Sequence, residues 1–151
     1  MKEHDRIERS VDLDAPVSRV WRALTDHREF GEWFEVKLEK PFAVNQVSRG
    51  HITHPGYEHI PWESVVKCIE PEKKFAYSWH PFAIDPKVDY SGEKPTLVEF
   101  TLGKSKKGTR LTVLETGFDQ LPSARRQKAF EMHEHGWTEQ MKNIEKYLRQ
   151  E

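Results

Sequence analysis

The chain begins with an alternation of inward and outward positions. Over residues 7–13 every second side chain faces the same side, and a period of two predicts a β-strand. That face carries Ile7, Arg9, Val11 and Leu13. Because Arg9 is charged and its neighbours on this face are apolar, we expect its side chain to form a polar contact.

Two short helices are predicted next. Apolar residues over 17–24 recur at the i, i+3, i+4, i+7 spacing of an amphipathic helix, and Asp14 is a suitable N-cap for it. Asp26 can cap a second helical piece over 27–34, which we expect Gly31 to interrupt.

From residue 35 to residue 118 the patterns are mostly those of strands. We predict them over 35–38, 46–53, 62–69, 74–80, 96–104 and 109–118, the last two joined as a hairpin over 105–108. Residues 81–95 contain Pro81, Pro86, Gly92 and Pro95, which predict a long loop.

The last predicted element is one long helix over 123–149. Its apolar face is formed by Phe130, His133, Trp137, Met141, Ile144 and Leu148. At ~1.5 Å per residue this helix is about 40 Å long, and only a curved sheet can cover its apolar stripe. We therefore predict an α+β helix-grip fold. A seven-stranded antiparallel sheet would wrap around the C-terminal helix, and the two short helices would close one end.

Composition narrows the class of protein. The 151 residues fit a single domain spanning 1–151, and the 24 Lys+Arg against 25 Asp+Glu argue against a nucleic-acid binder. No apolar run is long enough to insert into a membrane. The polar N-terminus and the single cysteine, Cys68, are typical of a cytoplasmic protein. The sheet's edges are compatible with a monomer or a homodimer.

Several segments resemble a known family. They are 14–26 (DAPVSRVWRALTD), Trp33-Phe34, 70–79 (EPEKKFAYSW), 108–118 (GTRLTVLETGF) and Gly136-Trp137. Together they resemble the START-like (Bet v 1-like, SRPBCC) superfamily, within it the branch named for the activator of heat-shock protein 90 ATPase. The resemblance implies the helix-grip fold over nearly the whole chain. It implies little about activity, because these are mostly packing and turn residues.

Arg9 and Glu115 form a candidate polar pair. In the expected fold the first and last strands are antiparallel neighbours, and a register that pairs residue 13 with residue 111 places Arg9 opposite Glu115. Both would face the interior, where a buried charge needs a partner. The pair is either an anchor for a ligand's polar group or a structural ion pair.

Histidines offer further candidates. His133 lies on the inward stripe of the long helix, where an imidazole either contacts a ligand or hydrogen-bonds a core neighbour. His51, His54 and His59 lie close in sequence, but their irregular spacing around Pro55-Gly56 favours a solvated strand and loop over a zinc site. We predict no metal and no cofactor, since dinucleotide and phosphate-binding motifs are absent from the sequence.

The number of aromatic residues bears on whether a cavity lies between the sheet and the long helix. The chain has many wide rings and few aliphatic side chains to fill the gaps between them, which favours a slot between sheet and helix. We expect the slot to be lined by Trp62, Trp79, Phe100, Trp137 and Met141. The loop over 81–95, with Phe82 and Ile84, is a candidate lid.

These features favour a non-enzymatic domain that binds a small hydrophobic or aromatic ligand, with polar anchoring by Arg9, Glu115 or His133. The resemblance to the chaperone activator suggests an alternative, an interaction protein that binds a protein partner through its surface. A second alternative is a cyclase- or hydrolase-like enzyme. It requires His133 and Glu115 within hydrogen-bonding distance beside a shared void. We identify no catalytic residue from the sequence.

Overall fold

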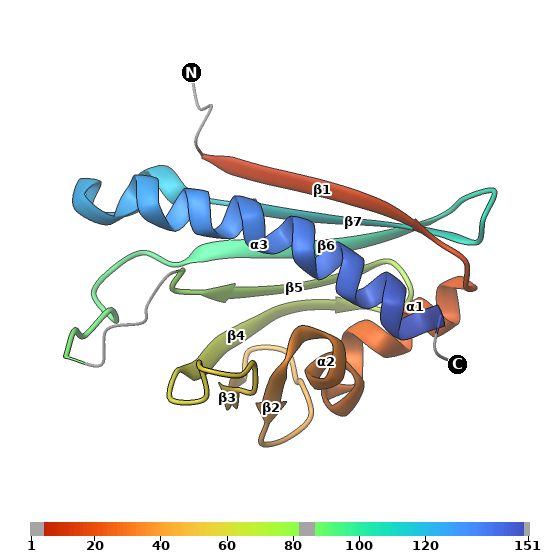
Figure 1. The fold of residues 1–151 in the computed structure, drawn as a ribbon, viewed down its shortest axis with the longest axis horizontal. Helices are drawn as coiled ribbons and strands as arrows, with labels where there is room; N and C mark the ends of the chain where they lie inside the picture. Colours follow the sequence, from red (N-terminus) through yellow and green to blue (C-terminus); the bar gives the residue numbers. More distant parts are fainter. Residues whose placement is uncertain (1–4, 82–86, 150–151) are drawn as a thin grey trace.

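The computed structural model describes residues 5–81 and 87–149 and has the predicted α+β helix-grip architecture (Figure 1). In chain order the elements are β1 (Arg6–Leu13), α1 (Val17–Thr25), α2 (His27–Phe34), β2 (Val36–Leu38), β3 (Val47–Ile52), β4 (Pro61–Glu70), β5 (Lys74–Trp79), β6 (Thr96–Lys104), β7 (Thr109–Thr116), the 3-10 turn η1 (Phe118–Gln120) and α3 (Ser123–Arg149).

The strands form a seven-stranded antiparallel sheet in the order β1-β7-β6-β5-β4-β3-β2. Helix α3 lies across one face of this sheet, and α1 and α2 lie near its C-terminal end (Figure 1). The hydroxyl of Tyr147, near the end of α3, donates a hydrogen bond to Glu29 of α2 at 2.9 Å. Within the described residues no helix is both long and apolar enough to cross a membrane.

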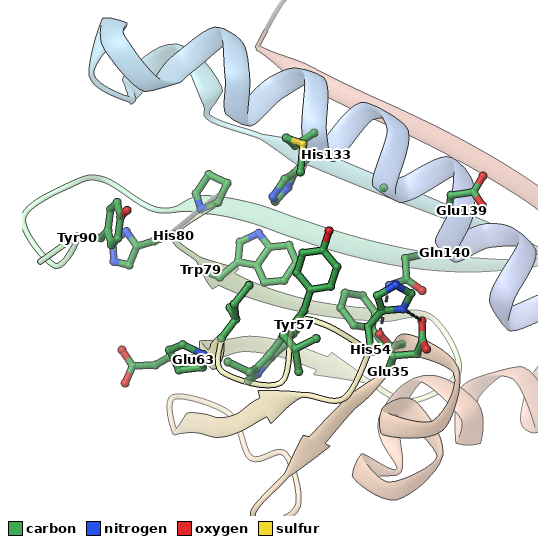
Figure 2. A pocket seen from close by; sticks show the side chains of 18 of the residues that line it. Glu35, His54, Tyr57, Glu63, Trp79, His80, Tyr90, His133, Glu139 and Gln140 are labelled. Atoms are coloured by element: carbon green, nitrogen blue, oxygen red, sulfur yellow. Dashed lines mark hydrogen bonds and ion pairs between the residues drawn. The ribbon is translucent and has the colours of Figure 1, made fainter. Parts of the chain in front are cut away.

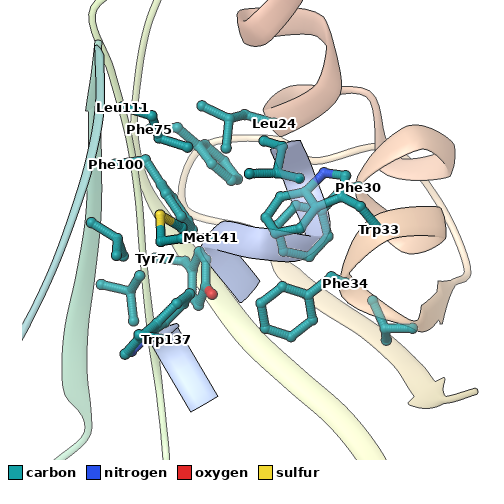
Figure 3. Packing of buried hydrophobic residues seen from close by; sticks show 14 of the residues in the cluster. Leu24, Phe30, Trp33, Phe34, Phe75, Tyr77, Phe100, Leu111, Trp137 and Met141 are labelled. Carbon is teal, nitrogen blue, oxygen red and sulfur yellow. The ribbon is translucent and has the colours of Figure 1, made fainter. Parts of the chain in front are cut away.

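The hydrophobic core lies between α3, the sheet and the two short helices (Figure 3). Its aromatic rings pack edge to face and stacked, as for Phe30 with Trp33 at 5.0 Å and Phe30 with Phe34 at 4.8 Å between ring centroids. The α3 stripe follows the sequence pattern, since Trp137, Met141 and Ile144 are buried. The rings therefore supply most of the packing that a chain with few aliphatic residues can achieve.

The predicted register between the first and last strands is wrong by two residues. Leu13 pairs with Thr109, so that Arg9 lies opposite Val113 and Ile7 opposite Glu115. The turn before β7 fixes this register: Thr109 Oγ1 donates to the carbonyl of Ala15 at 2.7 Å. Gly108 lies so close that an added Cβ would come within 2.6 Å of the same oxygen. This contact seats the β6–β7 hairpin on the junction between β1 and α1.

Two expectations about the short helices also need correction. Helix α1 begins at Val17 with Pro16 at the N-cap and no side-chain cap, so Asp14 lies too early in the chain to cap it. Helix α2 is not interrupted at Gly31. That glycine permits close packing, because a Cβ there would lie 2.3 Å from the carbonyl oxygen of Val36. Asp26 caps α2 as predicted, accepting from the backbone of Arg28 and Glu29.

Candidate functional site

A cavity of about 600 Å³ lies between the middle of α3, the ends of β4 and β5, and the two loops that flank these strands (Figure 2). We call it the main cavity. Its apolar walls are formed by Phe34, Ile52, Tyr57, Ile60, Pro61, Trp62, Trp79, Pro81, Val88, Tyr90 and Met132. Its polar lining consists of Glu35, His54, Glu63, His80, Asp89, Ser91, His133, Glu139, Gln140 and Asn143.

The missing side chain of Gly136 contributes to the opening of the main cavity. This glycine lies inside α3, where a glycine weakens a helix by roughly 0.5–1 kcal/mol relative to alanine. A Cβ at this position would meet no atom within 4 Å. The position is therefore open toward the cavity, between the neighbouring lining residues Met132 and Gln140 one turn away on either side.

Arg125 at the start of α3 holds the loop after β5 in place. Its guanidinium forms two hydrogen bonds with the Glu93 carboxylate, at 3.1 and 2.8 Å, and one with the Pro81 carbonyl at 2.9 Å. It also lies 4.6 Å from the ring centroid of Tyr90. Because Tyr90 and Pro81 line the main cavity, this arginine positions one of its walls.

Behind the cavity wall lies a fully buried carboxylate, that of Glu115 on β7. It accepts hydrogen bonds from four side chains, of which one lies on β5, one on β6 and two on α3. The donors are Thr96 Oγ1 at 2.6 Å and Trp79 Nε1 at 2.8 Å to Oε2, and His133 Nδ1 and Trp137 Nε1, both at 2.7 Å, to Oε1. All four acceptor positions of the carboxylate are thus filled.

The environment keeps Glu115 ionised. Burial by itself raises the pKa of this carboxyl, but the charge of His133 and the hydrogen bonds from His133 and the other donors outweigh burial and lower the pKa below its ordinary value. An ionised carboxylate only accepts hydrogen bonds, so Nδ1 of His133 carries the proton in this contact. The carboxylate therefore fixes the orientation of the imidazole.

The structure brings three of the predicted site residues to the main cavity: Trp62, Trp79 and His133. Trp137 instead borders a smaller recess of about 90 Å³, which shares Trp79 and His133 with the main cavity. Phe100 and Met141 are buried in the core and do not line the main cavity, and Glu115 lies behind His133. His133 and Glu115 are thus hydrogen-bonded, but only His133 reaches the void.

Arg9 does not meet Glu115, contrary to the expected pairing. Its guanidinium lies on the other flank of α3, where Nε donates to Thr138 Oγ1 at 3.0 Å and a terminal nitrogen donates to the Glu134 carbonyl at 3.3 Å. There it lines a separate groove between β1 and the start of α3. The two-residue shift in register, together with the position of β1 at the sheet edge, explains the difference.

Several lining residues were missed because they lie in irregular segments. Tyr57 belongs to the loop between β3 and β4, and Tyr90 to the loop between β5 and β6. The proline and glycine at 55–56 marked the first loop as a turn, but nothing in the sequence places it over α3. The second loop was a candidate lid. Val88 and Tyr90 of this loop line the cavity, whereas Phe82 and Ile84 lie outside the described residues.

The three neighbouring histidines do not converge in the part of the chain that the structure describes. His54 forms a hydrogen bond with Glu35 at 2.9 Å, while His51 and His59 are exposed. No group of three or more His, Cys, Asp or Glu side chains among the described residues is placed to hold a metal ion.

Comparison with known proteins gives a family match. Residues 14–149 match the model of the family described as "Activator of Hsp90 ATPase homolog 1-like protein". This match confirms the resemblance seen in the sequence segments. No curated protein matches the chain.

Solved structures with the same fold come from several bacteria. Protein MLL2253 from Mesorhizobium loti is 23% identical with a TM-score of 0.75, and the alignment covers 96% of this chain and 97% of that one. A protein from Arthrobacter aurescens is 21% identical with a TM-score of 0.78, covering 99% and 88%. Protein NE0264 from Nitrosomonas europaea is 19% identical with a TM-score of 0.76, covering 99% and 97%. At these identities the likeness shows the fold alone.

Proposed function

The chain belongs to the Activator of Hsp90 ATPase homolog 1-like family, and we propose that it is a small-molecule-binding domain whose main cavity holds a hydrophobic or aromatic ligand. The observation that carries this proposal is the cavity itself. Its volume of about 600 Å³ falls within the roughly 300–1,000 Å³ of small-molecule sites. Aromatic walls with a few polar groups are the usual make-up of such sites.

The distribution of exposed apolar side chains supports the proposal that the main cavity binds a ligand. Among the described residues, the large hydrophobic side chains that are exposed are Val44, Tyr57, Val88 and Met132. All of these except Val44 line the main cavity, although they come from two loops and α3. Exposed apolar groups that gather in one place mark interaction sites. A ligand in the cavity would cover them, whereas the surface-interaction alternative would need a patch elsewhere.

Gly136 makes the proposal testable. Replacing it with leucine would place a side chain in the cavity beside His133 without a clash at Cβ, because no atom lies within 4 Å of that position. Lys128, an exposed residue of the same helix, offers the matched control Lys128→Leu. Both changes add a leucine to α3, but only the first alters the cavity.

The experiment starts with native mass spectrometry of the purified protein, followed by a thermal-shift screen of fused-ring aromatic compounds. A ligand at a hundred times its Kd stabilises the folded state by about 2.7 kcal/mol. For a chain of this size that raises Tm by roughly 5–10 °C. We expect this shift in the wild type and in Lys128→Leu, and its loss in Gly136→Leu.

Two outcomes would overturn the proposal. One is a stabilising compound that acts equally on all three proteins, which would place its site outside the main cavity. The other is the absence of any bound mass and of any stabilisation across the screen, which would favour the surface-interaction alternative.

A further inference from the structure

The imidazole of His133 lines the main cavity and is bound on one side by Glu115. Its Nδ1 is held by Glu115, and Nε2 has no hydrogen-bond partner among the described residues. When the ring is neutral and Nδ1 donates its proton to the carboxylate, the lone pair lies on Nε2. In this form the ring offers one hydrogen-bond acceptor, and the buried network around Glu115 fixes the ring's orientation beside the cavity.

The carboxylates that line the main cavity influence which charge a bound ligand can carry. The lining includes the carboxylates of Glu35, Glu63, Asp89 and Glu139, and none of the described lining residues is a lysine or an arginine. The cations that pair with two of these carboxylates, Arg49 with Glu63 and Lys142 with Glu139, do not line the cavity. Like charges across an interface suppress binding, so this lining disfavours an anionic ligand.

The shape of the walls suits a flat ring system. Trp62 and Trp79 meet edge to face with ring centroids 5.0 Å apart, and Trp79 packs against His133 at 5.3 Å. Tyr57 and Tyr90 lie on the loop side of the same cavity (Figure 2). A planar aromatic ligand against Trp79 would bring a substituent on its edge close to the His133 ring.

We propose that the ligand of the main cavity is a neutral aromatic alcohol, whose hydroxyl group donates a hydrogen bond to Nε2 of His133. This inference rests on the proposed function and adds the chemical class of the ligand. It assigns His133 as the specificity-determining residue and Glu115 as the positioning residue that acts through it.

Three naphthalene probes of nearly equal size test separately the effect of a hydroxyl donor and the effect of a negative charge on binding. 2-Naphthol has a donor, 2-methoxynaphthalene has the same ring without a donor, and 2-naphthoate carries a negative charge. Kd values are measured by fluorescence titration at pH 8, below the pKa of about 10 of an ordinary phenolic hydroxyl, so that 2-naphthol is neutral. We expect 2-naphthol to bind about tenfold more tightly than 2-methoxynaphthalene, the effect of one hydrogen bond. We expect 2-naphthoate to bind most weakly.

Two histidine variants identify the acceptor. His133→Asn keeps a nitrogen donor for Glu115 but removes the acceptor at Nε2, so the preference for 2-naphthol over its methyl ether should fall to within twofold. His135→Asn, an exposed neighbour on the same helix, should keep the full preference. Circular dichroism checks that both variants are folded.

Tightest binding by 2-naphthoate, or a preference for 2-naphthol that persists in folded His133→Asn, would overturn the inference. Equal binding of all three probes would also overturn it while leaving the ligand-binding function intact. Failure of all three probes to bind would count against both. The ranking on the wild-type protein decides the inference even where His133→Asn does not fold.

Discussion

Replacing Glu115 with glutamine tests the buried network at its centre. The side chain keeps its size, but the charge and half of the acceptor capacity are lost. The carboxylate now accepts from Trp79 and Thr96 on one oxygen and from His133 and Trp137 on the other. An amide has one oxygen and one NH₂ group, so whichever way it turns, two of the four charge-assisted bonds are lost. The NH₂ group then faces one indole N–H as donor against donor, and either Thr96 or His133 must change from donor to acceptor.

The magnitude follows from these contacts. A hydrogen bond to a charged group contributes about 1.5–3 kcal/mol, so the loss of two amounts to roughly 3–6 kcal/mol. Relief of the cost of burying a charge offsets part of this loss. We therefore expect Glu115→Gln to lower the free energy of unfolding by about 3 kcal/mol at pH 7. Urea unfolding followed by tryptophan fluorescence measures it, and Tm should fall by roughly 6–12 °C.

The pH dependence provides a second test of the same network. The pKa of Glu115 is lowered in the folded protein from an ordinary value of 4.5, so its ionised form stabilises the fold. That contribution is fully present above pH 4.5 and is lost as the pH falls through the folded-state pKa. The stability gap between wild type and Glu115→Gln should therefore be constant near neutrality and narrow in acid.

Glu63, an exposed carboxylate on β4, supplies the control. Glu63→Gln should change stability by no more than about 0.5 kcal/mol, as expected for an exposed ion pair. The reasoning would be refuted by a Glu115→Gln variant within about 1 kcal/mol of wild type. A gap that stays constant into acid would refute it equally.

Two further predictions concern the backbone and a loop. Gly31→Ala should destabilise the protein by about 2–3 kcal/mol, because the new Cβ would lie 2.3 Å from the Val36 carbonyl oxygen. Gly136→Ala, also within a helix but with open space around it, should stabilise by about 0.5–1 kcal/mol, and equal signs in urea unfolding would contradict this account. Arg125→Met should increase the rate of limited proteolysis within 87–95, because the ion pair with Glu93 and the contact with Tyr90 are lost. An unchanged cleavage rate would show that other contacts hold this loop.

The elements could be predicted because their signals are local. The α3 helix has the predicted bounds, because its apolar residues recur every three or four positions along the sequence. Asp26 was recognisable as a cap because capping involves only the next few residues.

The register between β1 and β7 could not be predicted from alternation. A slip of two residues leaves every side chain on the same face, so pairing Leu13 with residue 111 or with Thr109 fits the pattern equally well. The docking of Gly108 against Ala15 decides between them, and this contact involves residues far apart in the sequence.

The site was predicted only in part, for a related reason. Glu115 and His133 stood out as polar positions on apolar faces, but the donors that meet at Glu115 come from β5, β6 and α3. Tyr57 and Tyr90 lie in loops, which have no periodicity to reveal the direction of a side chain. The assembly of the cavity therefore depends on tertiary contacts that local patterns do not encode.

The central claim is that the main cavity binds an aromatic ligand, and the most direct measurement is a ¹H–¹⁵N NMR titration of the wild-type protein with 2-naphthol. The indole signals of Trp62 and Trp79 report on the cavity, whereas Trp21 on α1 does not line it and serves as an internal reference. The account predicts saturable shifts for Trp62 and Trp79 with Trp21 unchanged. Shifts confined to backbone amides of the groove beside Arg9, or no saturable shift at all, would contradict it.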